Sequence, residues 1–573
     1  MMSKKLHDNE RIKAESHYLR GSLKEDLANS ITGSLKGDNT QLTKFHGFYQ
    51  QDDRDVRIAR QKQKLEPLYS FMLRARVPGG IITPKQWLAI DDVAARLTFY
   101  DSIRLTTRQT FQYHGVSKFA LKDVIKAIDG VMIDSIAACG DVNRNVLCSP
   151  NPVETPLHAN IYEHAKALSE ELLPKTKAYY ELFLDGEKVS HNQEEEPLYG
   201  STYLPRKFKV AFVIPPYNDV DVRAHDLGYI AIIKDDKLIG YNVTVGGGMG
   251  SNHAEVNTFP RLADDLGFIE ASDIFEVAKA VMTTQRDWGN REDRKRARLK
   301  YTIEDYGLNK FKAEVEKRAN VKFTKAKPYS FRHNDDNLGW LKGYDGRWHL
   351  GCFIAEGRIV DNEQHQLKTG LREIAKIHKG DFRMTANQNI IISNVDKVDK
   401  KIIEDLAKKY GLINNASILR QKSMACVAFP TCGLAMAESE RYMDTLIERL
   451  HTLLQKHNIS YMPEIRMTGC PNGCARPYVA EIAFVGKSLG RYNVYLGGDG
   501  KGERMNALYK ENYNEEQILE LFDGLFAQYK NGAKEEETFG DFVIRSQIIH
   551  ENKIPSQDFH KLGGYYNESR ASQ

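Results

Sequence analysis

The sequence predicts a mixed α/β, or α+β, protein of about three packed units with an internal repeat. The chain has 573 residues, too many for one hydrophobic core, because domains usually hold about 100–200 residues. Strand-like and helix-like stretches alternate along it. A strand–helix–strand unit from the first quarter of the chain returns in weaker form within residues 348–394. This echo indicates a duplicated half.

The composition excludes some classes of function. Hydrophobic residues make up 41% and charged residues 28%, as in an ordinary globular protein. The net charge is only +4, which gives no reason to expect nucleic-acid binding. The start, MMSKKLHDNERIKAES, lacks the apolar stretch of a signal peptide, and no apolar run is long enough to span a bilayer. We therefore expect a cytoplasmic protein without membrane contact, whose 7 cysteines are free, metal-bound or catalytic.

Residues 1–62 are polar and rich in charge. They contain the loop-like ITGSLKGDNTQ and the charge-dense QQDDRDVRIARQKQKLE. This pattern predicts a mobile arm followed by a surface helix. The arm is either a tail without a role or a segment that docks a partner protein.

The first copy of the repeat begins with the strand-like SFMLRARVPGG, which ends in a Pro-Gly-Gly turn. A helix is expected over ITPKQWLAIDDVAARL, with Thr83 as N-cap and Pro84 at its first position. SIRLTTRQTFQYHG then reads as a strand. Alternate side chains of a strand share a face, and one face here is wholly polar, so it meets either water or an anion. That face holds Arg104, Thr106, Arg108, Thr110, Gln112 and His114.

The second copy consists of the strand pair WHLGCFIAEGRIV, the helix LKTGLREIAKIHKG and the strand DFRMTANQNIIISN. R-L-T-T-R-Q-T in the first copy is echoed as R-M-T-A-N-Q-N, so Asn387 stands where the first copy has Arg108. Coincidence between two αβ segments is the alternative. If the halves share ancestry, only the first need keep full anion-binding charge, and the second face is either a remnant pocket or structural.

Four cysteines lie in two tight pairs, within SMACVAFPTCGLAMAE and MTGCPNGCARPYVAE. The spacing is C-x5-C, then 37 residues, then C-x3-C, formed by Cys426, Cys432, Cys470 and Cys474. Structural zinc usually takes C-x2-C pairs in short polar modules, whereas these pairs are wider and lie in an apolar context. A cubane cluster needs four sulfurs spread around a larger object. A zinc site and four buried free thiols remain the alternatives.

Positive side chains are also spaced in a suggestive way. In R-K-F-K, Lys207 and Lys209 should point to one side of an extended chain, with Phe208 toward a core. Two adjacent lysines repel each other unless an anion lies between them. Arg76 ends a strand before a turn, and Arg144 stands in N-R-N. Any one of these cations taken alone reads equally well as a solvated surface charge.

The cysteine pattern C-x5-C…C-P-N-G-C resembles the sulfite and nitrite reductase family. Within it, the chain is similar to haemoprotein subunits that receive electrons from NADPH through a separate flavoprotein. The similarity covers roughly residues 45–550 and rests on further motifs: FHGFYQQDDRD, LRARVPGG, IRLTTRQTFQYHG, NRNVLC, TYLPRKFK, VGGGMG, TTQRDWGNR, IHKGDF and GDFVIR. The resemblance implies a sirohaem, a [4Fe-4S] cluster held by the four cysteines, and the six-electron reduction of sulfite to sulfide.

The resemblance also implies roles for single residues. Cys474 would bridge the cluster and the sirohaem iron. Arg76 and Arg144 would mainly bind substrate, and Lys207 and Lys209 would deliver protons. Carboxylate-rich sirohaem needs many donors, which would be Arg104, Thr106, Arg108, Gln112, His114, Asn143 and Arg206.

The implied architecture has three domains with a pseudo-twofold repeat. The boundaries expected are an N-terminal arm that docks the flavoprotein (1–62), ferredoxin-like half-domains (63–130 and 336–410), a sirohaem- and substrate-binding domain (131–335) and a domain that ligates cluster and sirohaem (411–573).

No nucleotide-binding fingerprint is visible, because no G-x-G-x-x-G opens a helix after a strand. NADPH, FAD and FMN are therefore expected on the flavoprotein partner. The alternative within the family is a ferredoxin-dependent sulfite or nitrite reductase, although the QQDDRD segment favours the flavoprotein-coupled form. A hypothesis of another class is a non-catalytic iron–sulfur or zinc protein, which a colourless preparation would support.

Overall fold

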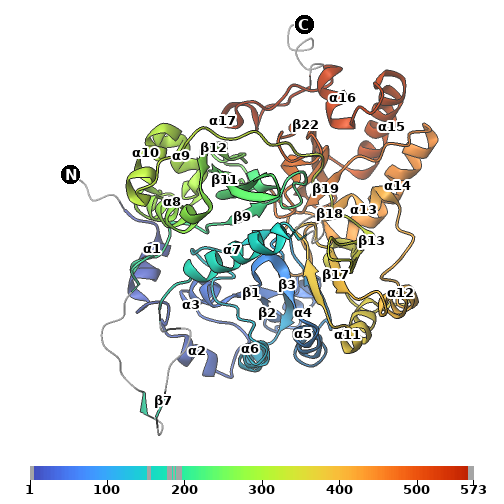
Figure 1. Ribbon diagram of the computed structural model, residues 1–573. Helices are drawn as coiled ribbons and strands as arrows, with labels where there is room; N and C mark the ends of the chain where they lie inside the picture. The colour runs from blue at the N-terminus through green and yellow to red at the C-terminus, as the bar shows by residue number, and fades with distance from the viewer. Residues whose placement is uncertain are drawn as a thin grey trace.

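The computed structural model describes residues 5–150, 156–176, 178, 183–184, 187–188 and 196–564. Four five-stranded sheets, which form two similar pairs, are its framework (Figure 1). Within the described residues, no helix is long and apolar enough to cross a membrane. The mixed α/β class predicted from the sequence is confirmed.

The first pair of sheets corresponds to the predicted repeat. Sheet 1 has the order β1 (Phe48–Asp52), β2 (Tyr69–Arg74), β5 (Phe111–Val116), β4 (Ile103–Leu105) and β15 (Arg358–Ile359). Sheet 2 has the order β13 (Gly339–Lys342), β14 (Trp348–Cys352), β17 (Ile390–Val395), β16 (Asp381–Met384) and β3 (Ile81–Ile82). Each sheet takes its last strand from the other half, since β15 pairs with β4 and β3 pairs with β16. Neither sheet is complete without both halves.

Helices α5 (Pro84–Leu97) and α11 (Leu367–Ile377) pack against each other between these sheets. Thr83 caps α5 as predicted: its hydroxyl accepts the Gln86 N–H at 3.2 Å, and the Gln86 side chain accepts the Thr83 N–H at 2.8 Å. Trp87 of α5 is fully buried, and its ring centroid lies 5.6 Å from that of Phe382 in sheet 2. One hydrophobic core therefore joins the two half-domains.

The second pair of sheets extends the duplication beyond the predicted halves. Sheet 3 has the order β12 (Asp264–Ile269), β11 (Lys237–Val245), β10 (Leu227–Lys234), β9 (Val210–Val213) and β6 (Leu147–Cys148). Sheet 4 has the order β18 (Ser423–Ala425), β19 (Ile465–Thr468), β20 (Ile482–Ser488), β21 (Arg491–Leu496) and β22 (Ala507–Tyr513). In each sheet three adjacent strands are parallel, β10, β9 and β6 in sheet 3 and β18, β19 and β20 in sheet 4. The two remaining strands, β11 and β12 or β21 and β22, extend the sheet by antiparallel pairing.

Helices cover the outer sides of this second pair. Figure 1 shows α8 (Ile274–Trp288) and α10 (Leu308–Ala319) outside sheet 3, and α14 (Glu440–Lys456) and α15 (Glu515–Gly532) outside sheet 4. The inner edges of both sheets face the half-domains. The segments that precede and follow β9 and β19 consequently meet near the centre of the molecule.

Residues 8–52 are folded, so the prediction of a mobile arm is wrong for this segment. Helix α1 (Asp8–Glu15), helix α3 (Asn39–Leu42) and strand β1 contribute buried apolar side chains, which are widely spaced among charged ones. The many polar and charged residues suggest disorder, but Ile12, Leu19, Leu42 and Phe45 belong to the core beneath sheet 3. The following helix α4 (Arg57–Lys62) has no buried residue and is a surface helix, as predicted. Strand β1 joins sheet 1 as its edge strand, beside β2.

Candidate active site

The four cysteines of the two pairs converge at the ends of two parallel strands. Cys426 follows β18, and Cys470 follows the neighbouring β19 by two residues. The Gly469 N–H donates to Cys426 Sγ at 3.3 Å, and the Asn472 amide donates to Cys470 Sγ at 3.5 Å. Burial and then the neighbouring Cys474 raise the pKa of the Cys470 thiol to about 12. The other three thiols also act electrostatically on Cys426, so the four cysteines lie close together.

The environment of these thiols fits a cluster better than a single ion. In the part of the chain that the structure describes, no three histidine, cysteine or acidic side chains lie close enough to share one metal ion. Cys426 and Cys432 pack against the apolar side chains of Ala428, Phe429 and Ala435. Four thiols that interact without meeting at one point suit a larger iron–sulfur body, which disfavours the zinc alternative.

Cationic side chains gather beside Cys474. The side chain of Phe208 lies in the core, while Lys207 and Lys209 project to the opposite side of the chain. Segment 142–144 runs beside them, because the Arg144 N–H donates to Phe208 O at 2.8 Å and the Phe208 N–H to Val142 O at 3.0 Å. Arg144 is thereby placed next to the lysines. We call this set the cation cup: Arg144, Arg206, Lys207, Lys209 and Arg298.

The charges of the cation cup are only partly compensated within the protein, by the buried carboxyl group of Asp226, on which Lys207, Lys209 and Arg298 act. Neither lysine forms an ion pair with any residue described, and the groups that act most strongly on Lys207 are other cations, led by Arg298. Burial, with Arg108 and Arg298, lowers the pKa of Lys209 to about 7, and Cys474 is also among the groups that act on it. Burial and Arg294 lower the pKa of Arg206 to about 9. Such an arrangement needs an anion.

Arg76 lies apart from the cation cup. Its guanidinium is held by Asp134 at 2.6 Å and Glu170 at 2.8 Å, which neutralise its charge. Arg74, two residues earlier, instead acts electrostatically on Arg108 and His114. Its Nη1 lies 3.6 Å from Cys139 Sγ. Cys139 also acts electrostatically on Arg144, so it lies near both arginines. The structure therefore brings Arg74, rather than Arg76, toward the other cations.

The predicted sirohaem cradle divides into two groups. Arg104 donates to Glu440 at 2.9 Å and to Ala425 O at 3.0 Å, so it holds the start of the loop that carries Cys426. His114 lies 3.2 Å from Thr431 Oγ1, next to Cys432. With its amide oxygen turned toward Arg74, Gln112 accepts from Arg74 Nε at 2.8 Å. These three side chains thus have protein partners.

Arg108 and Asn143 form the second group. Arg108 contacts His225 Nδ1 at 3.2 Å and donates to Asn145 O, and its own N–H donates to Thr106 Oγ1 at 3.1 Å. Arg108 Nε and Asn143 Oδ1 are buried and lack hydrogen-bond partners among the described residues. Buried polar atoms are nearly always paired, so these two point to an additional polar group. They fit the polar substituents of an anionic macrocycle.

A glycine-rich loop packs directly on the second cysteine pair. Gly473 has φ +63°, and a Cβ there would lie 2.6 Å from Met249 O, so only glycine fits this contact. The Ser251 N–H donates to Pro471 O at 3.0 Å. Lys300 holds the loop from below by donating to Gly250 O at 2.7 Å. The glycines after β11 therefore serve close backbone packing.

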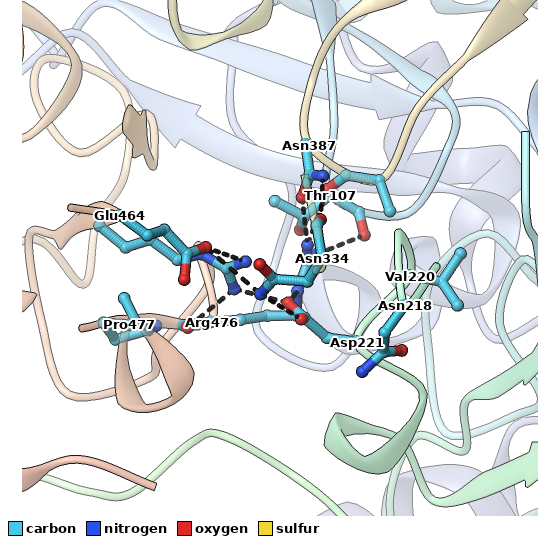
Figure 2. Close-up of polar contacts among 12 residues, drawn as sticks. Thr107, Asn218, Val220, Asp221, Asn334, Asn387, Glu464, Arg476 and Pro477 are labelled. Atoms are coloured by element: carbon cyan, nitrogen blue, oxygen red, sulfur yellow. Dashed lines mark hydrogen bonds and ion pairs between the residues drawn. The ribbon is translucent and has the colours of Figure 1, made fainter. Parts of the chain in front are cut away.

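Asp221 is the centre of a buried charge cluster that sequence reasoning missed (Figure 2). Arg466 of β19 and Arg476, two residues after Cys474, both lie 2.5 Å from its carboxylate. Burial opposes ionisation, but the two guanidinium groups hold the pKa of Asp221 below its usual range. Arg476 also donates to Asn387 Oδ1 at 3.0 Å and to Thr107 O at 3.2 Å. The cluster thus ties the Cys474 turn to the equivalent strand ends of both half-domains.

Two family models match most of the chain. The model of the nitrite and sulphite reductase 4Fe-4S domain matches residues 163–323 and 420–547, and that of the ferredoxin-like half domain of these enzymes matches residues 63–131 and 341–411. The chain is 57% identical over 564 residues to proteins named sulfite reductase [NADPH] hemoprotein beta-component, from Shewanella sp. strain ANA-3 and Shewanella oneidensis. That alignment covers 98% of this chain and 100% of each relative.

The chain belongs to the nitrite and sulfite reductase family. All four cysteines fall within the second matched segment of the 4Fe-4S domain. The fold agrees with that of the Mycobacterium tuberculosis NirA protein, with a TM-score of 0.77, 23% identity, and coverage of 94% of this chain and 96% of that one. The predicted pair of ferredoxin-like halves is confirmed by the family match.

Membership of the family explains why the two sets of residues lie together. The cysteine loops would hold the iron–sulfur cluster that the family description names, and the cation cup lies beside the last cysteine. Cys474, Arg108 and Asn143 are the residues that would contact a haem of the sirohaem type.

Proposed function

We propose that the chain reduces sulfite to sulfide at a sirohaem that is joined to a [4Fe-4S] cluster through Cys474. The observation that carries this proposal is the cation cup beside that cysteine, in which the cations outnumber the one carboxyl group, Asp226, that acts on Lys209. The printed names of the curated relatives support sulfite as the substrate. When bound, the two cofactors supply electrons one at a time to the anion.

The residues of the cation cup divide the remaining work. The Arg144 guanidinium is held by neutral acceptors, Gly140 O at 2.9 Å and Ala138 O at 3.2 Å, so it keeps its charge for the sulfite oxygens. Arg74 is the better candidate for the second arginine, because Arg76 is neutralised by its carboxylate partners. Lys207 and Lys209 are the proton donors, since their lowered pKa values make loss of a proton easy.

Proton supply is a central demand of the reaction. Sulfite takes up six electrons and six protons, and it leaves as sulfide and three molecules of water. Each electron added without a proton would increase the negative charge in an enclosed site. Lys209, whose pKa is lowered to about 7, can lose and regain a proton near neutral pH and so meets this demand, whereas a fully paired arginine such as Arg76 would not.

The electrons come, in this proposal, from NADPH through a separate cytoplasmic flavoprotein that carries FAD and FMN. The sequence contains no nucleotide-binding fingerprint, and the relatives are named as beta-components of NADPH enzymes. The exposed helix α4 and the segment around it remain the proposed docking region. A ferredoxin donor is the alternative.

The test uses the purified full chain, reconstituted with both cofactors, and reduced methyl viologen as an electron donor that needs no partner. We expect sulfide production with a kcat/KM for sulfite well above that for nitrite. The Arg144→Ala variant should raise the KM for sulfite at least tenfold, as expected for loss of a charged contact. A pigmented protein that produces no sulfide, or a variant with an unchanged KM, would contradict the proposal. Adding the flavoprotein or a ferredoxin in place of methyl viologen then distinguishes the donors.

A further inference from the structure

The folded N-terminal segment, residues 7–52, packs directly behind the cation cup. Lys13 of α1 is only 2% exposed. Its Nζ donates to Leu204 O at 2.8 Å and lies 3.7 Å from Asp141. Leu204 stands just before R-K-F-K, and Asp141 stands just before N-R-N. A single lysine of the N-terminal helix thus contacts both chain segments that carry the cup.

This contact is part of a buried network of five charges. Lys13 lies 2.6 Å from Glu10, which also pairs with Arg291, and Arg294 donates to both oxygens of Asp141 at 2.8 and 3.0 Å. Burial opposes ionisation of Asp141, but Arg294 and Lys13 hold its pKa below the usual range. Buried charges are stable only when all partners remain in place. The segment before Arg144 is therefore fixed partly by residues of α1.

A second contact reaches Arg144 itself. The hydroxyl of Tyr49, in β1, lies beside the Arg144 guanidinium and favours its charged form. The guanidinium donates hydrogen bonds to the carbonyls of Gly140 and Ala138, in its own loop. The position of Tyr49 is set by sheet 1, because it pairs with Met72 of β2. Tyr49 thus connects a rigid sheet to the far end of a long arginine side chain.

We propose that the N-terminal segment is a constituent of the anion site and that Tyr49 is a positioning residue for Arg144. Tyr49 is a neutral polar group, so it fixes the direction of the guanidinium without reducing its charge. Glu10, Lys13 and Asp141 hold the backbone on which Arg144 stands. This inference rests on the proposed role of Arg144 in binding sulfite. If the N-terminal segment only docked a partner, its loss would leave activity with methyl viologen intact. If it is part of the anion site, its loss should lower that activity.

The test compares Tyr49→Phe with Tyr69→Phe, the same change on the neighbouring strand β2 away from the cup. Activity is measured on the holoenzyme with methyl viologen, so no partner protein is involved. For Tyr49→Phe we expect the KM for sulfite to rise about three- to tenfold, the range for one lost polar contact, with kcat within about twofold of wild type. A spectral titration of the oxidised enzyme with sulfite should give the same increase in Kd. Tyr69→Phe should change neither value.

Three further results separate the possible failures. An unchanged KM and Kd in Tyr49→Phe, together with a raised KM in Arg144→Ala, would overturn the positioning role and leave the proposed function intact. An unchanged KM in both variants would overturn the role of Arg144 itself. A fall in kcat and in cofactor content without a change in Kd would indicate a merely structural role and also overturn the inference.

The ion network is tested with Lys13→Met and the matched control Lys24→Met, whose lysine is exposed on α2 (Leu23–Ala28). The Lys13 variant should weaken sulfite binding in the same titration, and the control should not. Equal Kd values in the two variants, both with full cofactor content, would contradict a role for α1 in the site. If Lys13→Met does not fold, Glu10→Gln, which retains the shape of the side chain, gives the same test.

Discussion

Lys209 and Glu464 occupy the same place in the two halves of the molecule. Each stands immediately before a parallel strand, β9 or β19, and the carbonyl of each accepts an N–H from the next strand at 3.1 Å, from Leu227 and Ile482 respectively. Arg108 and Asn387 also correspond. Each lies in the turn between two antiparallel strands, β4 and β5 or β16 and β17, so the prediction of one continuous strand over each of these segments is wrong. One scaffold therefore presents a lysine and an arginine in one half, and a carboxyl and an amide in the other.

The second half also has a cavity, but the cations that line it, Lys422 and Arg466, are paired with carboxylates. A cavity of about 240 Å³ is lined there by Asp335, Asp336, Asn387, Asn389, Lys422 and Glu464, among others. Burial raises the pKa of Asp336 to about 6 and that of Glu464 to about 8. Acidic groups that resist ionisation indicate a place where negative charge is already unfavourable. The comparison teaches that the duplicated fold supplies the backbone, whereas a few charges decide which half can hold an anion.

The largest effect is expected from Cys474, which belongs to the second half but lies beside the cation cup of the first. Cys474→Ser should lose the cluster and the haem-type pigment together, and with them all sulfite reduction, because a serine hydroxyl is a poor ligand for iron–sulfur clusters. Iron, acid-labile sulfide and the visible spectrum of the purified variant measure this. Cys352→Ala, which removes a buried thiol of the second half, should retain all three. Full iron content and normal turnover in Cys474→Ser would rule out its bridging role.

Giving the first half the charge of the second should have the next largest effect. Lys209→Glu places a carboxylate where Glu464 stands in the other half, and we expect kcat/KM for sulfite to fall by about 10²–10³, the range for loss of one key electrostatic group. Lys397→Glu, an equal charge change at an exposed position of the second half, should leave the rate unchanged. Equal effects of the two changes would mean that net charge, rather than position, matters.

Two arginines of the same segment give a smaller and more specific contrast. Arg74→Ala should raise the KM for sulfite at least tenfold, because this charge acts on Arg108 and the cup. Arg76→Ala should leave the KM unchanged and lower the free energy of unfolding by about 1–3 kcal/mol, since Asp134 loses its partner. Urea unfolding and steady-state kinetics separate the two. The reverse pattern would restore Arg76 as the substrate contact.

The smallest expected effect is a change in pH dependence. The pKa of Lys209 is lowered from 10.5 to about 7, so its ammonium form, which binds and protonates the anion, is lost as the pH rises through about 7. We expect kcat/KM for sulfite to decline above that pH. In Lys209→Arg the guanidinium stays charged, so the decline should move to higher pH even if the rate is lower. An identical profile for both proteins would assign the titration to another group.

The sequence was sufficient where the pattern is local. Spacing predicted the four cysteines as one set, and they lie close together. Alternation placed Lys207 and Lys209 on one side of the chain with Phe208 in the core. Thr83 caps its helix as expected. These features depend on neighbours a few residues away, so they are legible in one sequence. The family resemblance supplied the cofactors, which spacing alone left open.

What the sequence could not reveal depends on distant partners. Arg76 is neutralised by Asp134, 58 residues later, and nothing in L-R-A-R-V distinguishes it from Arg74. The exchanged strands β3 and β15 have two residues each, too short to give an alternating pattern. Asp221 meets Arg466 and Arg476 across more than 240 residues. The N-terminal segment looked disordered because its buried charges pair with residues far along the chain.

Cofactor content per chain tests the difference between the halves most directly. The holoenzyme should contain a single extractable sirohaem and about five iron atoms per chain, four in the cluster and one in the macrocycle, because among the residues described it is the first half whose buried cations outnumber the carboxyl groups beside them. Quantitative pigment extraction with iron analysis gives both numbers. Two tetrapyrroles per chain would contradict this account. So would an unchanged sirohaem content in a double variant in which Lys209 is replaced by glutamate and Arg108 by asparagine, the residues of the second half.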